Sequence, residues 1–491
     1  MKSMAFFSAT KLISLICRKK ISSVELLNLY KDRYDRLNPG INAIIATDFE
    51  NALKRAKKTD EALAQGMRWG PLHGLPMTIK ETYEVIGMPC TAGAPEFKDN
   101  YPSKNAAIVN DLLKAGAIIF GKTNVPLFAM DVQSFNEVYG QTNNPWDFTK
   151  TCGGSSGGAA AALAAGLTPL EIGSDIGGSI RNPAHFNGVY GHKPTFNIIS
   201  LSGHFPPPSN LFPGEYSGDG DIAVAGPLAR TVEDLELAMK LLVKPKPFQQ
   251  IATRIKLPPP RKKDLKDFRV GVWLDDPAFP VDSMVGDCLQ AAIDRLASAG
   301  VNISDKRPDI DFTCGYDIYL RLLHAVSALK ATDEEFEQAQ AQLAKLDEND
   351  QSTRAAQIRG MCLFHRDWMV LDQQRLLMRQ KWANFFKEFD CLLCPVVPIT
   401  AFPHDHREMM DDRVLLVNGR GRNYENTAIS WAGLTGVSYL PSTVAPTGLA
   451  KNGLPVGIQI VGPYLEDFTT LRFAKLIKGI VGEFVPPPGF E

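Results

Sequence analysis

Hydrophobic positions in the first 65 residues recur at the three-to-four-residue spacing of amphipathic helices. Ser8 precedes one such run as an N-cap, and Ser22 with Glu25 has capping-box spacing before a second run. We expect the second helix to end at Pro39 and the glycine after it, because these residues interrupt helical geometry. The pattern predicts that residues 1–65 form an N-terminal helical segment packed on the core.

From about residue 75 the pattern changes to short apolar runs that alternate with helical segments. The predicted strands are 75–80, 117–120, 170–175, 268–274, 391–397 and 456–462. The predicted helices are 106–114, 157–166, 231–243 and 283–299. This alternation is typical of an α/β fold in which helices cover a sheet. We assign residues 66–491 to one such domain, with a largely helical insertion at about 315–425.

Composition and charge narrow the functional classes. Hydrophobic residues make up 44% of the 491 positions, which is enough for a large core. The 53 basic and 54 acidic residues give a net charge of −1, so a basic surface for nucleic acid is not expected. No apolar run reaches the roughly 18 residues that a membrane span needs. We interpret the N-terminus as a helix rather than a signal peptide, and expect a cytoplasmic protein.

Cysteine and histidine patterns do not indicate a metal site or a disulfide framework. The eight cysteines lack regular spacing. Cys391 and Cys394 form a C-x-x-C, but their neighbours predict a buried strand, and no second pair completes a zinc site. His404 and His406 lie in a proline-flanked loop, where packing or contact with solvent is the simpler interpretation. We therefore expect neither a metal nor a cofactor.

Residues 116–123, GAIIFGKT, match the phosphate-binding pattern G-x-x-x-x-G-K-[ST]. Phosphate binding by this pattern requires a strand, then a loop, then a helix. Here a helix precedes Gly116, and the residues between the two glycines are strand formers. An ATP-binding protein that uses Gly116 to Thr123 is therefore a distant alternative.

Residues 153–158, GGSSGG, contain the nucleophile-elbow pattern G-x-S-x-G, with Ser155 at its centre. In an elbow the serine directly follows a strand, whereas the residues before this block are polar and turn-like. Because acidic residues and histidines follow further along the chain, a triad of serine, acid and histidine remains an alternative on the sequence pattern alone.

Residues 173–184, GSDIGGSIRNPA, run from a predicted strand into a helical start. Successive N–H groups could form a concave nest, which suits a developing oxyanion; they belong to Ile176, Gly177, Gly178 and Ser179. An ordinary strand–helix turn explains these residues equally well.

Together, these segments resemble the amidase signature family of serine hydrolases. The resemblance rests on GLPMTIKE around Lys80, on GGSSGG and on GSDIGGSIRNPA, and it covers most of the chain. It implies a three-layer α/β/α fold in which helices sandwich a large, mixed, twisted sheet. It also implies a Ser–cisSer–Lys triad. Ser179 matches the nucleophile, Ser155 the bridging serine whose peptide bond with Gly154 is cis, and Lys80 the base.

Amide cleavage by this triad requires an uncharged lysine, and burial at the end of an apolar strand favours the neutral amine. Many relatives have aspartate where this chain has Glu81, which we expect on the opposite side of the strand. Protons would pass from Ser179 through Ser155 to Lys80, leaving an acyl-Ser179 intermediate. The supporting residues we expect are Ser156, Asp175 and Arg181.

The predicted activity is that of a stand-alone amidase, which hydrolyses the C–N bond of a small-molecule carboxylic amide to acid plus amine or ammonia. The alternative within the family is the glutaminase-type subunit of a tRNA amidotransferase, although residues 218–223 resemble stand-alone amidases instead. His192 stands where relatives usually have leucine, and we assign it no function. A homodimer is left open. Candidates for the substrate pocket are Met130, Thr151, Cys152, Phe212 and Trp431.

Overall fold

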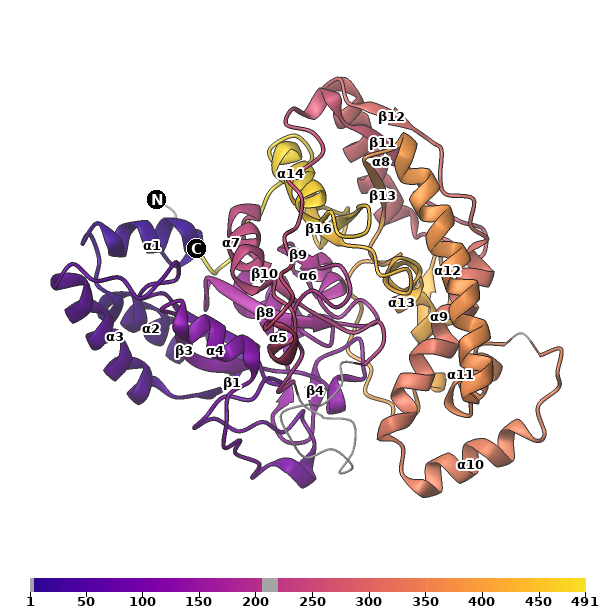
Figure 1. The fold of residues 1–491 in the computed structure, drawn as a ribbon, viewed down its shortest axis with the longest axis horizontal. Coiled ribbons are helices and arrows are strands. Elements are labelled where there is room, and N and C mark those ends of the chain that lie inside the picture. The colour runs from indigo at the N-terminus through magenta and orange to yellow at the C-terminus, as the bar shows by residue number, and fades with distance from the viewer. Residues whose placement is uncertain (1–3, 205–219, 351) are drawn as a thin grey trace.

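The computed structural model describes residues 4–204, 220–350 and 352–491, in which a mixed eight-stranded sheet is surrounded by helices (Figure 1). From edge to edge the strands are β12 (Asn302–Ser304), β11 (Arg269–Val272), β13 (Cys391–Pro395), β17 (Pro455–Val461), β16 (Ser442–Leu449), β9 (Tyr190–Lys193), β10 (Val224–Ala229) and β8 (Leu170–Asp175). Strand β11 pairs in parallel with β12 and β13, and the other neighbours are antiparallel. The predicted α/β fold with a large mixed sheet is confirmed.

A second sheet brings the end of another strand to β8. Its order is β1 (Ile44–Thr47), β3 (Ile118–Thr123) and β2 (Pro76–Lys80). The N–H of Thr78, in β2, donates to Thr168 Oγ1 over 3.1 Å. The Thr78 hydroxyl donates to the buried carboxyl group of Glu171, in β8. These contacts hold the two strands side by side, so that Lys80, the last residue of β2, lies near the C-terminal end of β8.

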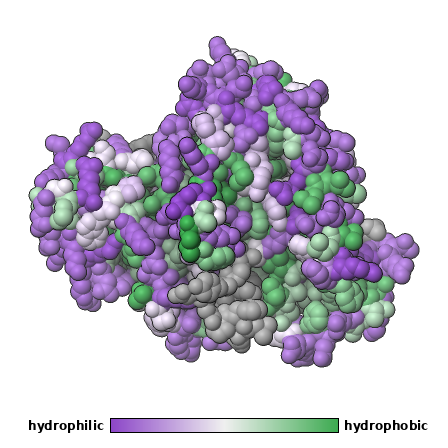
Figure 2. Space-filling model, in the orientation of Figure 1, coloured by the Kyte–Doolittle hydropathy of each residue, from purple (hydrophilic) through white to green (hydrophobic). Residues whose placement is uncertain are grey.

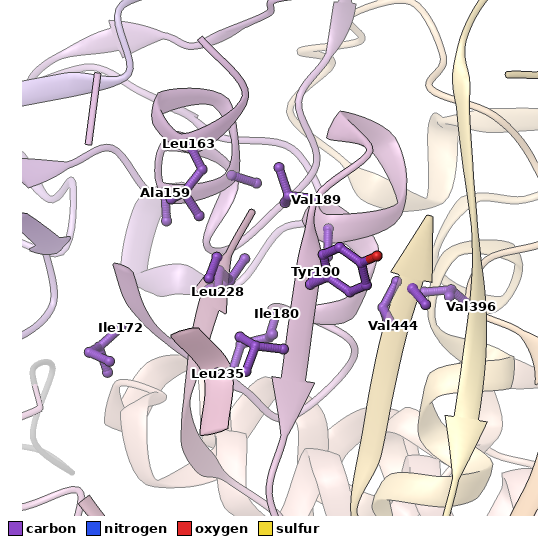
Figure 3. Close-up of a cluster of buried hydrophobic side chains, with 14 of the residues drawn as sticks. Ala159, Leu163, Ile172, Ile180, Val189, Tyr190, Leu228, Leu235, Val396 and Val444 are labelled. Carbon is purple, nitrogen blue, oxygen red and sulfur yellow. The ribbon is translucent and has the colours of Figure 1, made fainter. Parts of the chain in front are cut away.

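Helix α5 (Gly157–Ala164) lies inside the molecule, packed on β8, β10 and α6 (Arg181–Asn187). All of its residues are buried, and Figure 3 shows its Ala159 and Leu163 near Leu228 of β10. A Cβ atom at Gly158 would lie 2.4 Å from the backbone nitrogen of Asn124, so only glycine fits there. The run of glycine and alanine is therefore explained by close backbone approach, as expected for a buried helix.

The N-terminal helices are α1 (Ala9–Cys17), α2 (Ser23–Ile41) and α3 (Phe49–Ala64). The Ser8 cap and the capping box at Ser22 are both present, as predicted. The predicted end of α2 at Pro39 is wrong, because the helix continues to Ile41. A proline in the last turn only removes one N–H donor. The helix ends instead at Asn42, which is left-handed and donates its N–H to Asn38 O.

Buried polar contacts attach this N-terminal segment to the rest of the protein. Asp234, on α7 (Val232–Leu242), accepts hydrogen bonds from Ala9 N at 2.9 Å and Thr10 N at 2.8 Å. Arg33 of α2 donates to Ala165 O, and to Phe490 O at the other end of the chain. Helix α1 and the C-terminal end of the chain accordingly lie near each other in Figure 1.

The remaining helices lie along the second half of the chain, except for α4. They are α4 (Ala107–Lys114), α8 (Ser283–Ser298), α9 (Phe312–Ser327), α10 (Asp333–Leu343), α11 (Thr353–Met361), α12 (His365–Glu388), α13 (Tyr424–Gly436) and α14 (Asp467–Ile477). Short strands complete the structure: β4 (Phe135–Asn136), β5 (Gly140–Gln141), β6 (Asn143–Asn144), β7 (Asp147–Thr151), β14 (Val414–Val417) and β15 (Arg420–Asn423). Helices α9 to α12 form one side of the molecule in Figure 1, drawn in orange.

Hydrophilic side chains cover most of the face in Figure 2, with scattered apolar ones between them. Among the described residues, no helix is both long and apolar enough to cross a membrane. Within the same residues, no group of three or more histidine, cysteine or acidic side chains is arranged to hold a metal ion. Cys391 and Cys394 are buried thiols of β13 that form no disulfide, and the sequence predicted this strand.

The contacts of Asp234 predict a stability effect. Replacing Asp234 with alanine leaves the buried N–H of Ala9 and the partly buried N–H of Thr10 without acceptors, and should lower the free energy of unfolding by about 2–4 kcal/mol. Denaturant unfolding of the variant measures this loss. The matched control is Glu236→Ala on the same helix, which should change stability by less than about 0.5 kcal/mol. Equal effects of both variants would contradict the role assigned to Asp234.

Candidate active site

Lys80 ends β2 in a fully buried position, where its amine contacts two hydroxyl groups. Lys80 Nζ lies 2.7 Å from Ser155 Oγ and 2.9 Å from Ser174 Oγ. The next residue, Glu81, has separate partners, because its carboxylate accepts hydrogen bonds from the backbone N–H groups of Thr91 and Ala92. This matches the predicted placement of Glu81 away from the amine.

Ser155 follows a cis peptide bond to Gly154, as the resemblance implied. Gly154 packs closely on a neighbouring segment, since a Cβ atom there would lie 2.5 Å from Asp131 O and 2.8 Å from Gln133 N. Asp131 is in turn fixed by hydrogen bonds from Arg413 at 2.5 Å and from the Tyr424 hydroxyl at 2.6 Å. The backbone that carries Ser155 is thus held between α5 and a braced loop.

Ser179 is brought next to Ser155 through the backbone. The N–H of Ser156, the residue after Ser155, donates to Ser179 O over 3.0 Å. Ser156 also reaches β8, because its hydroxyl lies 3.3 Å from Ser174 O and 3.4 Å from Ser174 N. Ser179 is 8% exposed, compared with 2% for Ser155 and 0% for Lys80. All three residues are therefore buried, and the bond from Ser156 links the segments that carry Ser155 and Ser179.

Asp175 and Arg181 form a fully buried ion pair around the turn that carries Ser179. Arg181 Nη2 lies 2.8 Å from Asp175 Oδ1, and Arg181 Nε lies 3.0 Å from Asp175 Oδ2. The arginine also donates to Ala432 O, Thr435 Oγ1 and Gln459 Oε1. Burial alone would raise the pKa of Asp175, but the Arg181 charge and hydrogen bonds outweigh it and lower the pKa to about 2.

The same carboxylate shapes the predicted oxyanion nest. Gly178 N donates to Asp175 Oδ1 over 2.9 Å, so this N–H is already engaged. Among the described residues, we find no acceptor within hydrogen-bond distance of the N–H groups of Ile176, Gly177 and Ser179. Three of the four predicted donors therefore remain available to an oxyanion.

Helices α9 and α13 lie beside this nest. The Tyr319 hydroxyl donates to Ile176 O over 3.2 Å, and Ile429 lies 3.7 Å from where a Gly177 Cβ would be. Neither Tyr319 nor Ile429 was predicted from the sequence. No local motif marks these two residues, because they reach the site only through the packing of α9 on α13.

The predicted pocket residues lie in different parts of the structure. Thr151 and Cys152 are buried beside the glycine-rich block, where Thr151 Oγ1 accepts the N–H of Gly153 over 3.0 Å. Met130 is 47% exposed. Trp431 packs in an aromatic cluster with Trp273 and Phe312. Phe212, like residues 218 and 219 of the segment compared above, lies outside the described residues.

Two sequence features have structural explanations instead of catalytic ones. Residues Ile118–Thr123 form strand β3, and the buried Lys122 donates to Pro89 O, so a phosphate-binding loop is absent there. The ATP-binding alternative therefore has no structural support. His192 links β9 to α14, with its Nε2 3.1 Å from Asp467 Oδ1 and its Nδ1 2.9 Å from Thr443 Oγ1.

Comparison with known proteins identifies the family of the chain. The pattern of the Amidase family matches residues 25–471. The chain belongs to the amidase signature family. The relatives in this family include hydrolases that act on the C–N bonds of amides, and this chain is an enzyme of that class.

The relatives cover nearly the full length of the chain. It is 32% identical to indoleacetamide hydrolase of Bradyrhizobium diazoefficiens, over 97% of this chain and 87% of that protein. It is 30% identical to the A-type subunit of glutamyl-tRNA(Gln) amidotransferase of Acidothermus cellulolyticus, over 97% of this chain and 94% of that one. A crystal structure described as an amidase superposes with a TM-score of 0.77 at 27% identity, covering 97% of this chain and all of the other.

The buried ion pair predicts a pH-dependent stability effect. Arg181→Met leaves the Asp175 carboxylate buried without its partner, and should lower the free energy of unfolding by about 3–5 kcal/mol. The depressed pKa of Asp175 means that its stabilising contribution is present above the ordinary value near 3.8 and is lost as pH falls towards 2. Unfolding measured between pH 2 and 7 should show this acid-dependent component in the native protein.

The control is Arg366→Met, because Arg366 is an exposed arginine whose aspartate partner is its own neighbour in sequence. This variant should keep both the stability and the acid-dependent component of the native protein. If Arg181→Met were as stable as this control, the ion pair would not brace the turn.

Proposed function

We propose that the protein is an amidase in which Ser179 is the nucleophile, Ser155 relays a proton and Lys80 is the base. The observation that carries the proposal is the 2.7 Å contact between Lys80 Nζ and Ser155 Oγ in a fully buried position. Burial disfavours the charged ammonium, and an uncharged amine is what a base requires. The pairing of Ser156 N with Ser179 O supports the placement of the nucleophile beside the relay.

In the acylation step, Lys80 takes the proton of Ser155 while Ser155 takes that of Ser179. Ser179 Oγ then attacks the carbonyl carbon of the amide, and a C–O bond forms. Negative charge develops on the carbonyl oxygen, which the N–H groups of Ile176, Gly177 and Ser179 stabilise; one such donor can be worth about 3 kcal/mol. The tetrahedral intermediate collapses when Ser155 gives its proton to the leaving nitrogen and receives the proton held by Lys80, and the C–N bond breaks. Lys80 is then neutral again.

The deacylation step uses the same groups, with water in place of Ser179 as the nucleophile. The acyl group is then esterified to Ser179, and the amine or ammonia has left. Water attacks the ester carbonyl as its proton passes through Ser155 to Lys80. The carboxylic acid leaves when Ser179 regains a proton along the relay. No step requires a metal or an organic cofactor.

A second candidate function follows from the 30% identity with a subunit of glutamyl-tRNA(Gln) amidotransferase. A chain of that kind would release ammonia from glutamine for its partner in the complex. We favour the stand-alone hydrolase because the sequence of residues 218–223 resembles that of stand-alone amidases. The structure describes residues 220–223 of this segment.

Substitution of the three residues tests the mechanism. Ser179→Ala, Ser155→Ala and Lys80→Ala should each lower kcat for an acyl anilide at least about 10³-fold, because the residues act as one unit. Ser298→Ala, in an exposed turn of α8, is the matched control and should keep full activity. Thermal melting shows whether each variant is folded.

Covalent labelling separates the two serines. A fluorophosphonate should add its phosphonyl mass to the peptide that contains Ser179, because only the nucleophile forms the P–O bond. Labelling of Ser155 instead would replace this mechanism with the nucleophile-elbow alternative. Labelling of neither serine in an active enzyme would refute both.

A substrate panel tests the choice between the two functions. The purified chain alone should hydrolyse at least one acyl anilide or primary arylacetamide in steady state. The control reaction contains L-glutamine as the only amide. Ammonia release from glutamine that depends on the other components of an amidotransferase, with no hydrolysis of the other amides, would favour the second candidate.

A further inference from the structure

The base has a second hydroxyl partner that the three-residue mechanism does not use. Ser174 Oγ lies 2.9 Å from Lys80 Nζ, almost as close as Ser155 Oγ at 2.7 Å. Ser174 belongs to β8, where its neighbour Asp175 braces the nucleophile turn. Two hydroxyl groups of similar chemistry therefore contact one amine.

This arrangement creates competition for the base. A neutral amine has one lone pair and two N–H groups, so it can accept one strong hydrogen bond and donate two. If Ser174 donated its proton to the lone pair of Lys80, Ser155 could not. The base can serve Ser155 only when the proton of Ser174 has another acceptor.

His204 is placed to be that acceptor. Its Nε2 lies 2.9 Å from Ser174 Oγ and 3.0 Å from Thr82 Oγ1. A neutral imidazole with its proton on Nδ1 presents the Nε2 lone pair to Ser174, and this is the tautomer that the proposal requires. Ser174 then accepts an N–H from Lys80, and the lone pair of the amine is left for Ser155.

The backbone around His204 keeps the ring in this position. Gly203 O accepts the N–H of Glu84 over 2.9 Å, which attaches the segment to the turn after Lys80. Gly203 has φ +80° and a Cβ there would lie 2.5 Å from Ala106 Cα, so glycine is required for this close approach. The His204 ring packs edge-on against Tyr83, with ring centres 4.9 Å apart.

We propose that His204 is a positioning residue for the amide hydrolysis. By accepting the proton of Ser174, it orients Ser174 as an acceptor for Lys80 and thereby directs the lone pair of Lys80 to Ser155. This inference rests on the proposed function, because it gives His204 a role only if Lys80 is the base.

The experiment compares two replacements of His204 in the full-length enzyme. His204→Phe keeps the ring shape but removes the acceptor, and should lower kcat for an acyl anilide about tenfold with little change in KM. His204→Gln restores an acceptor oxygen near the place of Nε2, and should lose clearly less activity than the phenylalanine variant. His365→Phe, at an exposed histidine of α12, is the matched control for the same substitution.

A double-mutant cycle tests the bond from its other end. Ser174→Ala should also lower kcat, and the double variant with His204→Phe should be no less active than the less active of the two single variants, because both remove one interaction. The inference is overturned if the two losses multiply, if Phe and Gln at 204 lose equally, or if His204→Phe keeps the native kcat. Ser174→Ala still tests the bond if His204→Phe does not fold.

Fluorophosphonate labelling distinguishes failure of the proposed function from failure of the role proposed for His204. If Ser179 of the native enzyme is labelled while the His204 variants behave like the His365 control, the proposed function stands and the role of His204 is refuted. If Ser179 is not labelled in the native enzyme, the proposed function fails first, and the role of His204 fails with it.

Discussion

The site depends on an amine that has no contact with water. A lysine side chain normally keeps its ammonium group in solvent, and full burial is stable only where polar partners replace the water. Here the partners are hydroxyl groups on two different segments, the glycine-rich block and β8. Their positions follow from the contacts of Thr78, which hold β2 beside β8. Without that alignment of strands, the amine of Lys80 would not lie between these two hydroxyl groups.

The turn that carries Ser179 shows how a buried charge pair can distribute main-chain donors. Asp175 takes up the N–H groups of Gly178 and Ile180, and Arg181 compensates its charge. Because these donors are occupied, the remaining N–H groups of the turn are fixed in direction and stay open to a ligand. A flexible glycine turn lacks this selectivity, since each of its N–H groups would bind water or its own carbonyl groups.

The sequence predicted those features that are determined by neighbouring residues. The capping box at Ser22, the buried helix of small residues and the strand that ends at Lys80 all depend on local patterns. The family resemblance supplied the cis bond at Gly154 and the mixed sheet, which no local pattern contains. The error at Pro39 arose because the same residue breaks a helix interior and is tolerated in a last turn.

Contacts between distant segments could not be predicted. His204 reaches Ser174 across 30 positions, and Tyr319 reaches Ile176 across 143. Neither residue lies in a motif, and both depend on how a loop or a helix packs after the sheet has formed. The hydrogen bond from Gly178 N to Asp175 could not be predicted either, although both residues lie in one motif. The conformation of the turn determines which N–H groups reach the carboxylate.

The contacts of Arg181 with residues far along the chain determine when, during synthesis, the turn that carries Ser179 can be held in place. Its guanidinium group is anchored on Ala432 and Thr435 of α13, and on Gln459 of β17, the strand between β13 and β16 in the sheet. A ribosome must therefore release almost the whole polypeptide before the turn made some 280 residues earlier is held in shape. Partly synthesised chains thus carry the lysine and serines of the candidate site before the anchors of Arg181 exist.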